Sequence, residues 1–304
     1  MNKAAGTHTV AVSRISKSFN NTVVVDNISF DVRQGEVFGL IGPNGAGKTT
    51  TIRMIMDIIK PDSGEIFVLG ETLKGITKNK IGYLPEERGL YRKLRVIDSL
   101  VYLASLKDIT SHKARSQAEE LLERIGMLSH KNKKIEELSR GMGQLIQFLV
   151  AIVHDPQLVI LDEPFAGLDP VNTELLKGML ADLRNQGKAV ILSTHQMNQV
   201  EELCDRILMI DNGHNILYGS LSEIKAKYKT NTVIINFEGE LGQIPGVIKR
   251  RAHKDSTELV LNKNTTPEQI LKRLLDTGLI INRFEVSIPS LNEIFIEVVN
   301  ENQK

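Results

Sequence analysis

A glycine-rich stretch at residues 42–49, GPNGAGKT, constrains the fold of this chain more than any other feature. It fits the pattern G-x-x-x-x-G-K-[ST] completely, follows an apolar run at 37–41 and leads into a helical pattern at 49–59. This order predicts a strand, a tight loop and a helix. We therefore expect an α/β fold that is built around this unit.

The residue types in this loop favour the binding of a nucleotide. Glycines let successive backbone N–H groups converge on phosphate oxygens because no Cβ intervenes, and the helix N-terminus adds roughly half a positive charge. Lys48 is expected to reach the β- and γ-phosphates, and the Thr49 hydroxyl to bind the accompanying Mg²⁺. The alternative is a glycine-rich turn without a ligand, which the complete motif in this context disfavours. The predicted nucleotide-binding residues are Gly42, Pro43, Asn44, Gly45, Ala46, Gly47, Lys48, Thr49 and Thr50.

Composition limits the partners of the chain. Its 304 residues, 41% of them hydrophobic, suffice for one large α/β domain and a smaller one. The 38 lysines and arginines nearly balance the 37 aspartates and glutamates, so no nucleic-acid partner is expected. Neither a secretory signal at 1–13 nor a run of roughly 18 to 20 apolar residues is apparent, so work at a membrane is expected to need a partner. Cys204, the one cysteine, lies in an apolar pattern and is expected to be a buried thiol.

Short strands are predicted before the glycine-rich loop, at 10–15, 22–25 and 27–32. Phe19 lies just before an Asn-Asn turn that separates the first two strands. Its flat ring could stack on adenine, although on position alone a core phenylalanine is at least as plausible. Beyond the loop, the apolar period predicts helices at 95–107 and 112–125.

Acidic residues stand at the ends of two predicted buried strands. The strand at 81–84 ends at a proline, so Glu86 projects at the carboxyl end of the sheet, where open α/β sheets bind ligands. The apolar strand at 158–161 runs into Asp162 and Glu163. Asp162 is suited to hold Mg²⁺ and Glu163 to activate a water molecule. The alternative is a carboxylate pair that caps the next element.

Two further candidates depend on their position in the chain. His195 follows a buried strand at 189–194 and could contact a γ-phosphate there, although a lone histidine is more often structural. Ser139 opens an apolar helix, and the neighbouring Gly141 leaves the helix N-terminus open to an anion. A plain capped helix would explain this second feature equally well.

In this order the motifs resemble those of the ATP-binding subunits of ABC transporters, over about residues 8–220. The matching segments are GPNGAGKT (Walker A), LSRGM (signature), LVILDE (Walker B), AGLD (D-loop) and STH (switch histidine). The resemblance implies an α/β, ABC-type P-loop ATPase cassette at 1–220, with a parallel sheet core, an antiparallel N-terminal subdomain and a helical subdomain at about 88–155. It implies ATP and Mg²⁺ as cofactors, and it places Phe19 on adenine. The implied catalytic residues are Glu163, His195 and Lys48, and the implied metal ligands are Thr49, Glu86 and Asp162.

The resemblance also implies partners. Cassettes of this family work as head-to-tail dimers, in which Ser139 and Gly141 of one subunit would complete the ATP site of the other. This agrees with the lack of an obvious anion for that helix N-terminus within its own subunit. A separate transmembrane permease subunit is implied as well, with this chain peripheral at the cytoplasmic face of the cell membrane.

Three positions depart from the usual family pattern. Glu86 stands where many relatives have a glutamine; a carboxylate can still bind Mg²⁺, but its charge is expected to alter coupling. Arg140 and Met142 replace a glycine and the glutamine of LSGGQ. The helix start survives both changes, so activity is expected to be retained. With GYLPEERGLY at 82–91, this variant resembles the sodium and drug exporters of the NatA type.

Residues 221–304 are predicted to form a small α+β domain without a phosphate or metal site. Capping boxes open two helices, at Thr266 and Ser290. The segment resembles the C-terminal extension of the same exporters, and its role could be dimerisation or regulation. Strands are predicted at 232–237, 258–261 and 279–287.

The leading hypothesis is therefore the ATP-hydrolysing subunit of an exporter for ions, such as Na⁺, or drugs. An alternative is a soluble ABC ATPase acting on ribosomes or DNA, although such proteins usually carry two cassettes or a long coiled-coil insertion, and this sequence has neither. A nucleotide-binding regulator without turnover is a third reading. The presence of both Glu163 and His195 disfavours it.

Overall fold

The computed structural model describes residues 8–87, 89–228 and 231–302. Contacts divide the chain into two compact units, Met1–Leu221 and Ser222–Lys304. Two sequence predictions involve residues outside this description: the stretch at 1–13, where no secretory signal is expected, and the start of the helical subdomain at residue 88.

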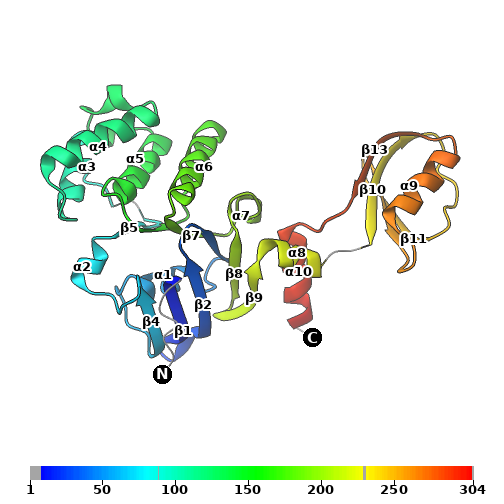
Figure 1. Cartoon of the computed structure of the whole chain (residues 1–304), viewed down its shortest axis with the longest axis horizontal. Coiled ribbons are helices and arrows are strands. Elements are labelled where there is room, and N and C mark those ends of the chain that lie inside the picture. Colours follow the sequence, from blue (N-terminus) through cyan, green and yellow to red (C-terminus); the bar gives the residue numbers. More distant parts are fainter. Residues whose placement is uncertain (1–7, 88, 229–230, 303–304) are drawn as a thin grey trace. The chain divides into compact units, whose positions relative to one another are not determined.

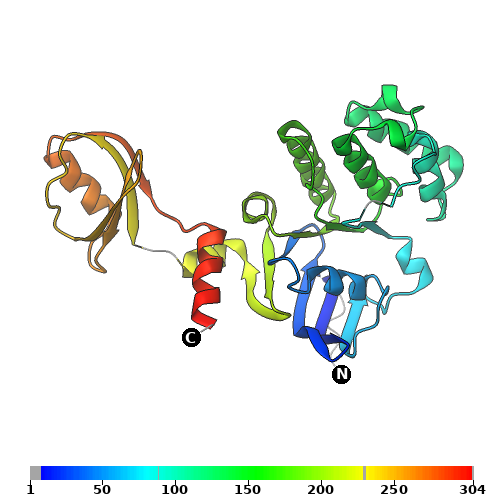
Figure 2. The same cartoon turned by 180° about the vertical axis from the view of Figure 1, so that it is seen from behind.

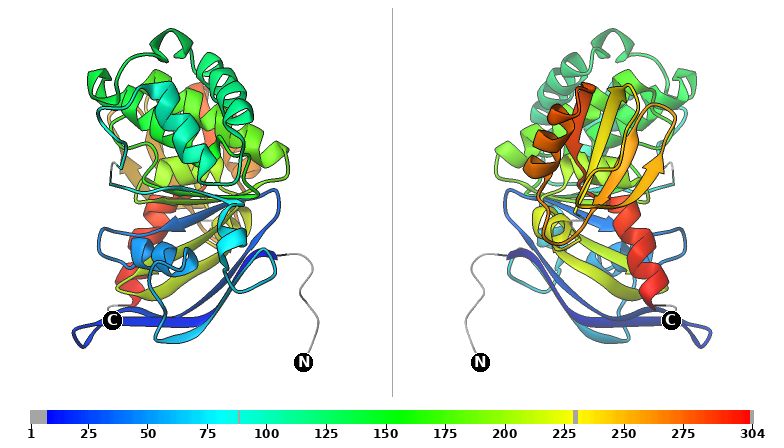
Figure 3. Two further views of the ribbon diagram at one scale, coloured as in Figure 1. Left: turned by 90° about the vertical axis from the view of Figure 1, so that its left-hand side faces the viewer. Right: turned by 90° about the vertical axis from the view of Figure 1, so that its right-hand side faces the viewer.

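A six-stranded sheet forms the centre of the first unit, in the order β5-β6-β7-β3-β8-β9 (Figure 1). The first five strands pair in parallel, and β9 pairs antiparallel with β8. Every residue of β3, β6 and β7 is buried, because helices cover one face and the antiparallel strands with α1 cover the other (Figure 3). The predicted parallel core is thereby confirmed. The strands are β3 (Val37–Ile41), β5 (Ile81–Leu84), β6 (Leu158–Asp162), β7 (Ala189–Thr194), β8 (Arg206–Asp211) and β9 (His214–Ser220).

A three-stranded antiparallel sheet has the order β2-β1-β4. Its strands β1 and β2 come before the glycine-rich loop in the chain, and β4 comes after it. The prediction of separate strands at 22–25 and 27–32 is wrong, because both belong to β2. Asn27, the first residue of the second predicted segment, has a φ of +49°, which interrupts the side-chain alternation while the pairing with β1 continues on either side. The strands are β1 (His8–Phe19), β2 (Thr22–Arg33) and β4 (Ser63–Val68).

The helix after the glycine-rich loop, α1 (Lys48–Ile55), is shorter than the predicted 49–59. Asp57 has a φ of +56°, and the Ile58 backbone N–H donates to the Arg53 carbonyl at 2.9 Å, so the chain leaves the helix there. Ile59 still packs against the core from outside the helix. The apolar period therefore continues beyond the helix that it predicted.

Three helices, α3, α4 and α5, pack against one another on one side of the central sheet (Figure 1). The predicted helices at 95–107 and 112–125 correspond to α3 and α4. Among the described residues, none of the helices combines the length and the apolar character needed to cross a bilayer. The helices of this unit are α2 (Gly75–Lys78), α3 (Val96–Ser105), α4 (Ser111–Arg124), α5 (Arg140–Ile152), α6 (Pro170–Asn185) and α7 (Met197–Leu203), with short 3₁₀ helices at Leu128–His130 and Ile135–Glu137.

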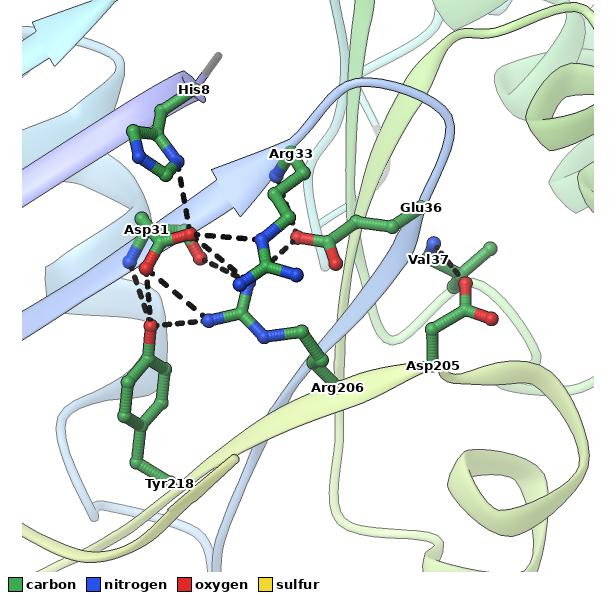
Figure 4. A network of polar contacts seen from close by, with 8 residues as sticks. All are labelled: His8, Asp31, Arg33, Glu36, Val37, Asp205, Arg206 and Tyr218. Carbon is green, nitrogen blue, oxygen red and sulfur yellow. Dashed lines mark hydrogen bonds and ion pairs between the residues drawn. The ribbon is translucent and has the colours of Figure 1, made fainter. Parts of the chain in front are cut away.

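A polar network centred on Arg206 joins the antiparallel sheet to the edge of the central sheet (Figure 4). The Arg206 Nη1 donates to Asp31 Oδ2 on β2 at 3.0 Å and to Glu36 Oε1 at 3.1 Å. The guanidinium also lies over the rings of Phe38 and Tyr218, at 5.8 and 5.2 Å from their centroids. These contacts fix the antiparallel sheet against the strand that carries the glycine-rich loop.

Cys204 follows α7, and its thiol is buried as predicted. A Cβ added at Gly39 on β3 would lie 3.0 Å from its sulfur atom, so the two elements pack closely. Burial raises the pKa of this thiol above its ordinary value, because it disfavours the thiolate. The position is therefore a packed core site.

The second unit is a four-stranded antiparallel sheet, in the order β11-β12-β10-β13, with α9 against one face (Figure 2). Both predicted capping boxes are present: Thr266 with Gln269, and Ser290 with Glu293. The sequence did not predict β11 or α8; β11 has no buried face to mark it. The elements are α8 (Leu221–Lys227), β10 (Thr232–Glu238), β11 (Val247–Ala252), β12 (Thr257–Leu261), α9 (Pro267–Asp276), β13 (Ile280–Val286) and α10 (Leu291–Asn302).

A buried histidine after α5 should make the first unit sensitive to acid. The His154 Nε2 lies 3.1 Å from the Ile81 carbonyl oxygen, and burial lowers the pKa of this imidazole to about 4. The unfolded chain binds a proton near pH 6.5, so this residue's stability contribution is present above that pH and is lost as the pH falls toward 4. We expect wild type to lose about 2 to 3 kcal/mol more than His154→Gln between pH 7 and pH 4.5.

Urea unfolding followed by circular dichroism at the two pH values measures this difference. The glutamine amide can still donate to Ile81, so the hydrogen bond is kept while the titration is removed. His112→Gln, on the exposed side of α4, controls for loss of an imidazole elsewhere. Equal pH dependence in wild type and His154→Gln would rule out His154 as the titrating group.

Candidate functional site

The glycine-rich loop leads from β3 into α1, and its backbone tolerates only glycine at two positions. Gly42 and Gly47 have φ values of +149° and +108°. A Cβ would lie 2.0 Å from the Ile210 carbonyl oxygen at Gly42 and 2.7 Å from the Val24 carbonyl oxygen at Gly47. Gly47 is also the N-cap of α1 and offers no side chain to its first-turn amides. These amides can therefore donate hydrogen bonds to an anion.

Lys48 and Thr49 begin α1 and face the acidic strand ends. The Lys48 ammonium is buried, and it donates to the carbonyls of Gly42 and Pro43 at 2.8 and 3.0 Å. Burial lowers the pKa of Lys48, while nearby carboxylates, including those of Glu163 and Asp162, counteract the shift. The Thr49 hydroxyl donates to Asp162 Oδ2 at 2.9 Å. The first turn of α1 is therefore connected directly to the tip of β6.

Asp162 carries a buried carboxylate that is only partly satisfied. Its exposure is 1%, and its Oδ1 has no hydrogen-bond partner within the described part of the chain. Burial raises its pKa, although the neighbouring Ser193 and Thr49 hydroxyls and the charge of Lys48 oppose this effect. An unpaired buried carboxylate oxygen beside a hydroxyl is a suitable donor set for Mg²⁺, which prefers oxygen ligands.

These few oxygens fit a cation that is bound mainly through a ligand's phosphates. No group of three or more histidine, cysteine, aspartate or glutamate residues with metal-binding geometry occurs among the described residues. Mg²⁺ in nucleotide sites commonly has one or two protein ligands, with phosphates and water completing its shell. Thr49, Asp162 and Glu86 are thus the residues that could hold it.

Glu163 lies at the start of the turn after β6 and is oriented by the end of β7. Its backbone has a φ of +49°, a conformation that a non-glycine residue adopts at some cost. The Thr194 hydroxyl donates to Oε2, and the His195 backbone N–H donates to Oε1, both at 3.1 Å. The His195 Nδ1 lies 2.7 Å from the same Oε1, so a proton on Nδ1 makes a third hydrogen bond.

One pocket of about 380 Å³ gathers most of the predicted site residues. Glu86, Asp162 and Glu163 meet the loop there, together with Val24, which the sequence analysis did not single out. The backbone carbonyl of Val24 packs against Gly47. This tertiary contact has no local sequence signal. The lining residues are Val24, Asn44, Gly45, Gly47, Lys48, Thr49, Thr50, Glu86, Asp162 and Glu163.

The other predicted site residues lie outside this lining. Phe19 ends β1 with 45% of its surface exposed, and the Lys17 ammonium lies 5.6 Å from its ring centroid. Ser139 is the N-cap of α5, where its hydroxyl accepts from the Met142 backbone N–H at 3.3 Å, and Gly141 lies in the same first turn. His195 reaches the pocket through Glu163 instead of lining it.

Comparison with known proteins agrees with this geometry. The family model described as "ABC transporter" matches residues 25–166, and the model described as "ATP-binding protein DrrA1-3-like, C-terminal domain" matches residues 219–299. The "Uncharacterized ABC transporter ATP-binding protein YhaQ" of Bacillus subtilis (strain 168) is 41% identical over 293 residues, which are 95% of this chain and 98% of that protein. This chain belongs to the ATP-binding proteins of the ABC transporter family.

Two further ABC proteins show how far the likeness extends. The "Nod factor export ATP-binding protein I" of Rhizobium sp. (strain N33) is 32% identical over 295 residues, 95% of this chain and 96% of that protein. A solved structure of an ATP binding subunit of an ABC transporter superposes with a TM-score of 0.68 at 29% identity, covering 72% of this chain and 93% of the other. The predicted cassette fold is confirmed. Membership of this family implies ATP binding and ATPase activity, and ABC ATP-binding subunits dimerise and work with transmembrane permeases.

Replacing Asp162 with asparagine tests the cost of its buried charge. The pKa of Asp162 is raised in the folded state, so the ionised carboxylate destabilises the fold at pH 7. The asparagine oxygen can still accept from Thr49. We expect Asp162→Asn to increase the free energy of unfolding at pH 7, a gain that shrinks as the pH falls through the raised pKa.

Urea unfolding of the nucleotide-free protein at pH 7, 5 and 4 provides the measurement. Glu123→Gln makes the same chemical change on the exposed face of α4 and serves as the matched control. The same Asp162→Asn protein should bind Mg²⁺-ATP more weakly, because the amide is a poorer ligand for the ion. A loss of stability at pH 7 would contradict the prediction.

Proposed function

We propose that this chain is the ATP-hydrolysing subunit of an exporter, which couples hydrolysis in a dimer of cassettes to transport through a separate membrane subunit. The convergence of Lys48, Thr49, Asp162, Glu163 and Glu86 on one pocket carries this proposal. Export is supported by the name of the Nod factor export relative and by the DrrA-like match at the C-terminus. The chain would be peripheral, at the cytoplasmic face of the membrane. By the resemblance to NatA-type proteins, the cargo would be an ion such as Na⁺ or a drug.

The proposed chemistry is the in-line attack of water on the γ-phosphate. Glu163 would accept the proton of that water, because its carboxylate lies at the pocket and is oriented by Thr194 and His195. The Lys48 ammonium would move from the loop carbonyls to the β- and γ-phosphates. Mg²⁺, held by Thr49, Asp162 and Glu86, would neutralise charge on the phosphates.

The second half of the site would come from another copy of the chain. Ser139 and Gly141 lie in the first turn of α5, outside the pocket of their own subunit. A helix N-terminus favours an anion, and a head-to-tail dimer would bring this one to the partner's nucleotide. Phe19, exposed at the end of β1, would stack on adenine.

Removing the carboxylate of Glu163 should stop hydrolysis while binding persists. Glutamine keeps the shape and can accept from Thr194 and His195, but it cannot take a proton from water. We expect Glu163→Gln to hydrolyse ATP at least 100-fold more slowly and to accumulate as an ATP-bound dimer. Phosphate release and size-exclusion chromatography with Mg²⁺-ATP measure the two effects. The enzymatic proposal fails if wild type is no faster than this variant.

A mixing experiment tests the shared site. Ser139→Asp keeps an N-cap acceptor for Met142 but places a negative charge where the partner's phosphate would lie. Lys48→Ala removes the ammonium. Each variant alone should be inactive, whereas an equimolar mixture should regain roughly a quarter of the activity, because heterodimers contain one intact site. Absence of any recovery would contradict the head-to-tail arrangement.

The transport step requires the membrane subunit. Vesicles that contain both subunits should move Na⁺ or a drug only with hydrolysable ATP, and Glu163→Gln should abolish the movement. Co-purification with RNA or ribosomes instead of a membrane protein would favour the alternative of a cytosolic ABC ATPase.

A further inference from the structure

Gln147 on α5 contacts the loop that carries Glu86. Its side chain is 4% exposed, and its Nε2 donates to the Pro85 carbonyl at 3.1 Å and to the Glu87 carbonyl at 3.2 Å. These two carbonyls flank Glu86 in the chain. One buried amide therefore holds the backbone on both sides of a residue that lines the nucleotide pocket.

The orientation of this amide is fixed by its partners. Both N–H groups of Gln147 have an acceptor, while its Oε1 is buried without a hydrogen-bond partner in the described part of the chain. Turning the amide over would place the oxygen against two carbonyl oxygens. Only the donor function of Gln147 is thus used, and an apolar side chain of equal length would fill the space without holding the loop.

Glu86 gains its position from this support. It lies just beyond the end of β5, its residue is exposed, and its carboxylate acts on the pKa of Lys48 across the pocket. The N-cap of the helix that supplies Gln147 is Ser139, eight residues and about 12 Å earlier. A single rigid element therefore joins the proposed site for the partner's nucleotide to Glu86 of the same chain.

We propose that Gln147 is a positioning residue, which holds Glu86 at the nucleotide pocket and makes its position follow that of α5. This inference rests on the proposed function, in which Ser139 contacts the partner's nucleotide. A displacement of α5 on nucleotide binding would move Glu86 through the two hydrogen bonds of Gln147. Each pocket would in this way respond to the occupancy of the other.

Gln144 on the same helix offers a matched control. Its side chain is 5% exposed, and its Nε2 donates to a backbone carbonyl at the same distance, 3.1 Å, but that carbonyl belongs to Pro164. Gln144 and Gln147 therefore share chemistry, burial and helix. They differ in the loop that they hold, and Gln144 donates to one backbone carbonyl where Gln147 donates to two. Gln144→Met and Gln147→Met separate the general loss of a buried amide from the loss of support for Glu86.

Backbone ¹⁵N relaxation of the nucleotide-free, full-length protein gives a readout that does not depend on turnover. In Gln147→Met, the order parameters of the Glu86 and Glu87 amides should fall from about 0.85, the value of a rigid backbone, toward about 0.6. In Gln144→Met they should stay at the wild-type values. Gln147→Leu serves as a second variant if Gln147→Met unfolds. Unchanged order parameters in folded Gln147 variants would overturn the proposal.

A double-mutant cycle tests whether Gln147 acts through Glu86. In Gln147→Met, the Mg²⁺ concentration for half-maximal ATPase should rise about tenfold, whereas in Gln144→Met it should not change. In a Glu86→Ala background, Gln147→Met should add less than twofold, because the group it positions is gone. A full additional tenfold effect would show that Gln147 acts elsewhere. If wild type hydrolyses no ATP, the proposed function fails instead, while the relaxation experiment still tests the support for the loop.

Discussion

The parallel pairing of β3, β7 and β6 is the constraint on which the whole site depends. Ile41 pairs with Thr194, and Asp162 pairs with Ser193, so these strands end at nearly the same level. The glycine-rich loop after β3, Glu163 after β6 and the turn after β7 therefore leave the sheet side by side. Backbone hydrogen bonds within a fully buried sheet bring these groups together, and the site residues contribute little to their own assembly.

Charge at the pocket is arranged for binding and not for stability. Burial shifts the pKa of both Lys48 and Asp162 toward their neutral forms, which shows that each charged group is costly where it lies. The positive φ of Glu163 adds backbone strain at the same edge. A well-packed core of apolar strands supports these unfavourable features, as is common where function and stability conflict.

The fold and most of the pocket could be predicted because they depend on local patterns. Apolar strands that end in carboxylates, and a complete loop motif between a strand and a helix, determine which chain segments meet. The length of α1 could not be predicted, because Ile59 packs on the core from outside the helix. The contacts of Gln147 could not be predicted either, since a glutamine in an apolar helix gives no sign of which distant carbonyls it holds. Such tertiary hydrogen bonds have no sequence period.

The packing of Cys204 against β3 has a practical consequence. The chain has one cysteine, its thiol is enclosed between α7 and the central sheet, and its thiolate is disfavoured by burial. Maleimide reagents should therefore not react with the native thiol in the folded cassette. Engineered surface cysteines can then be labelled one at a time without first removing it, which makes the protein convenient for spin-label or fluorescence measurements of domain movement.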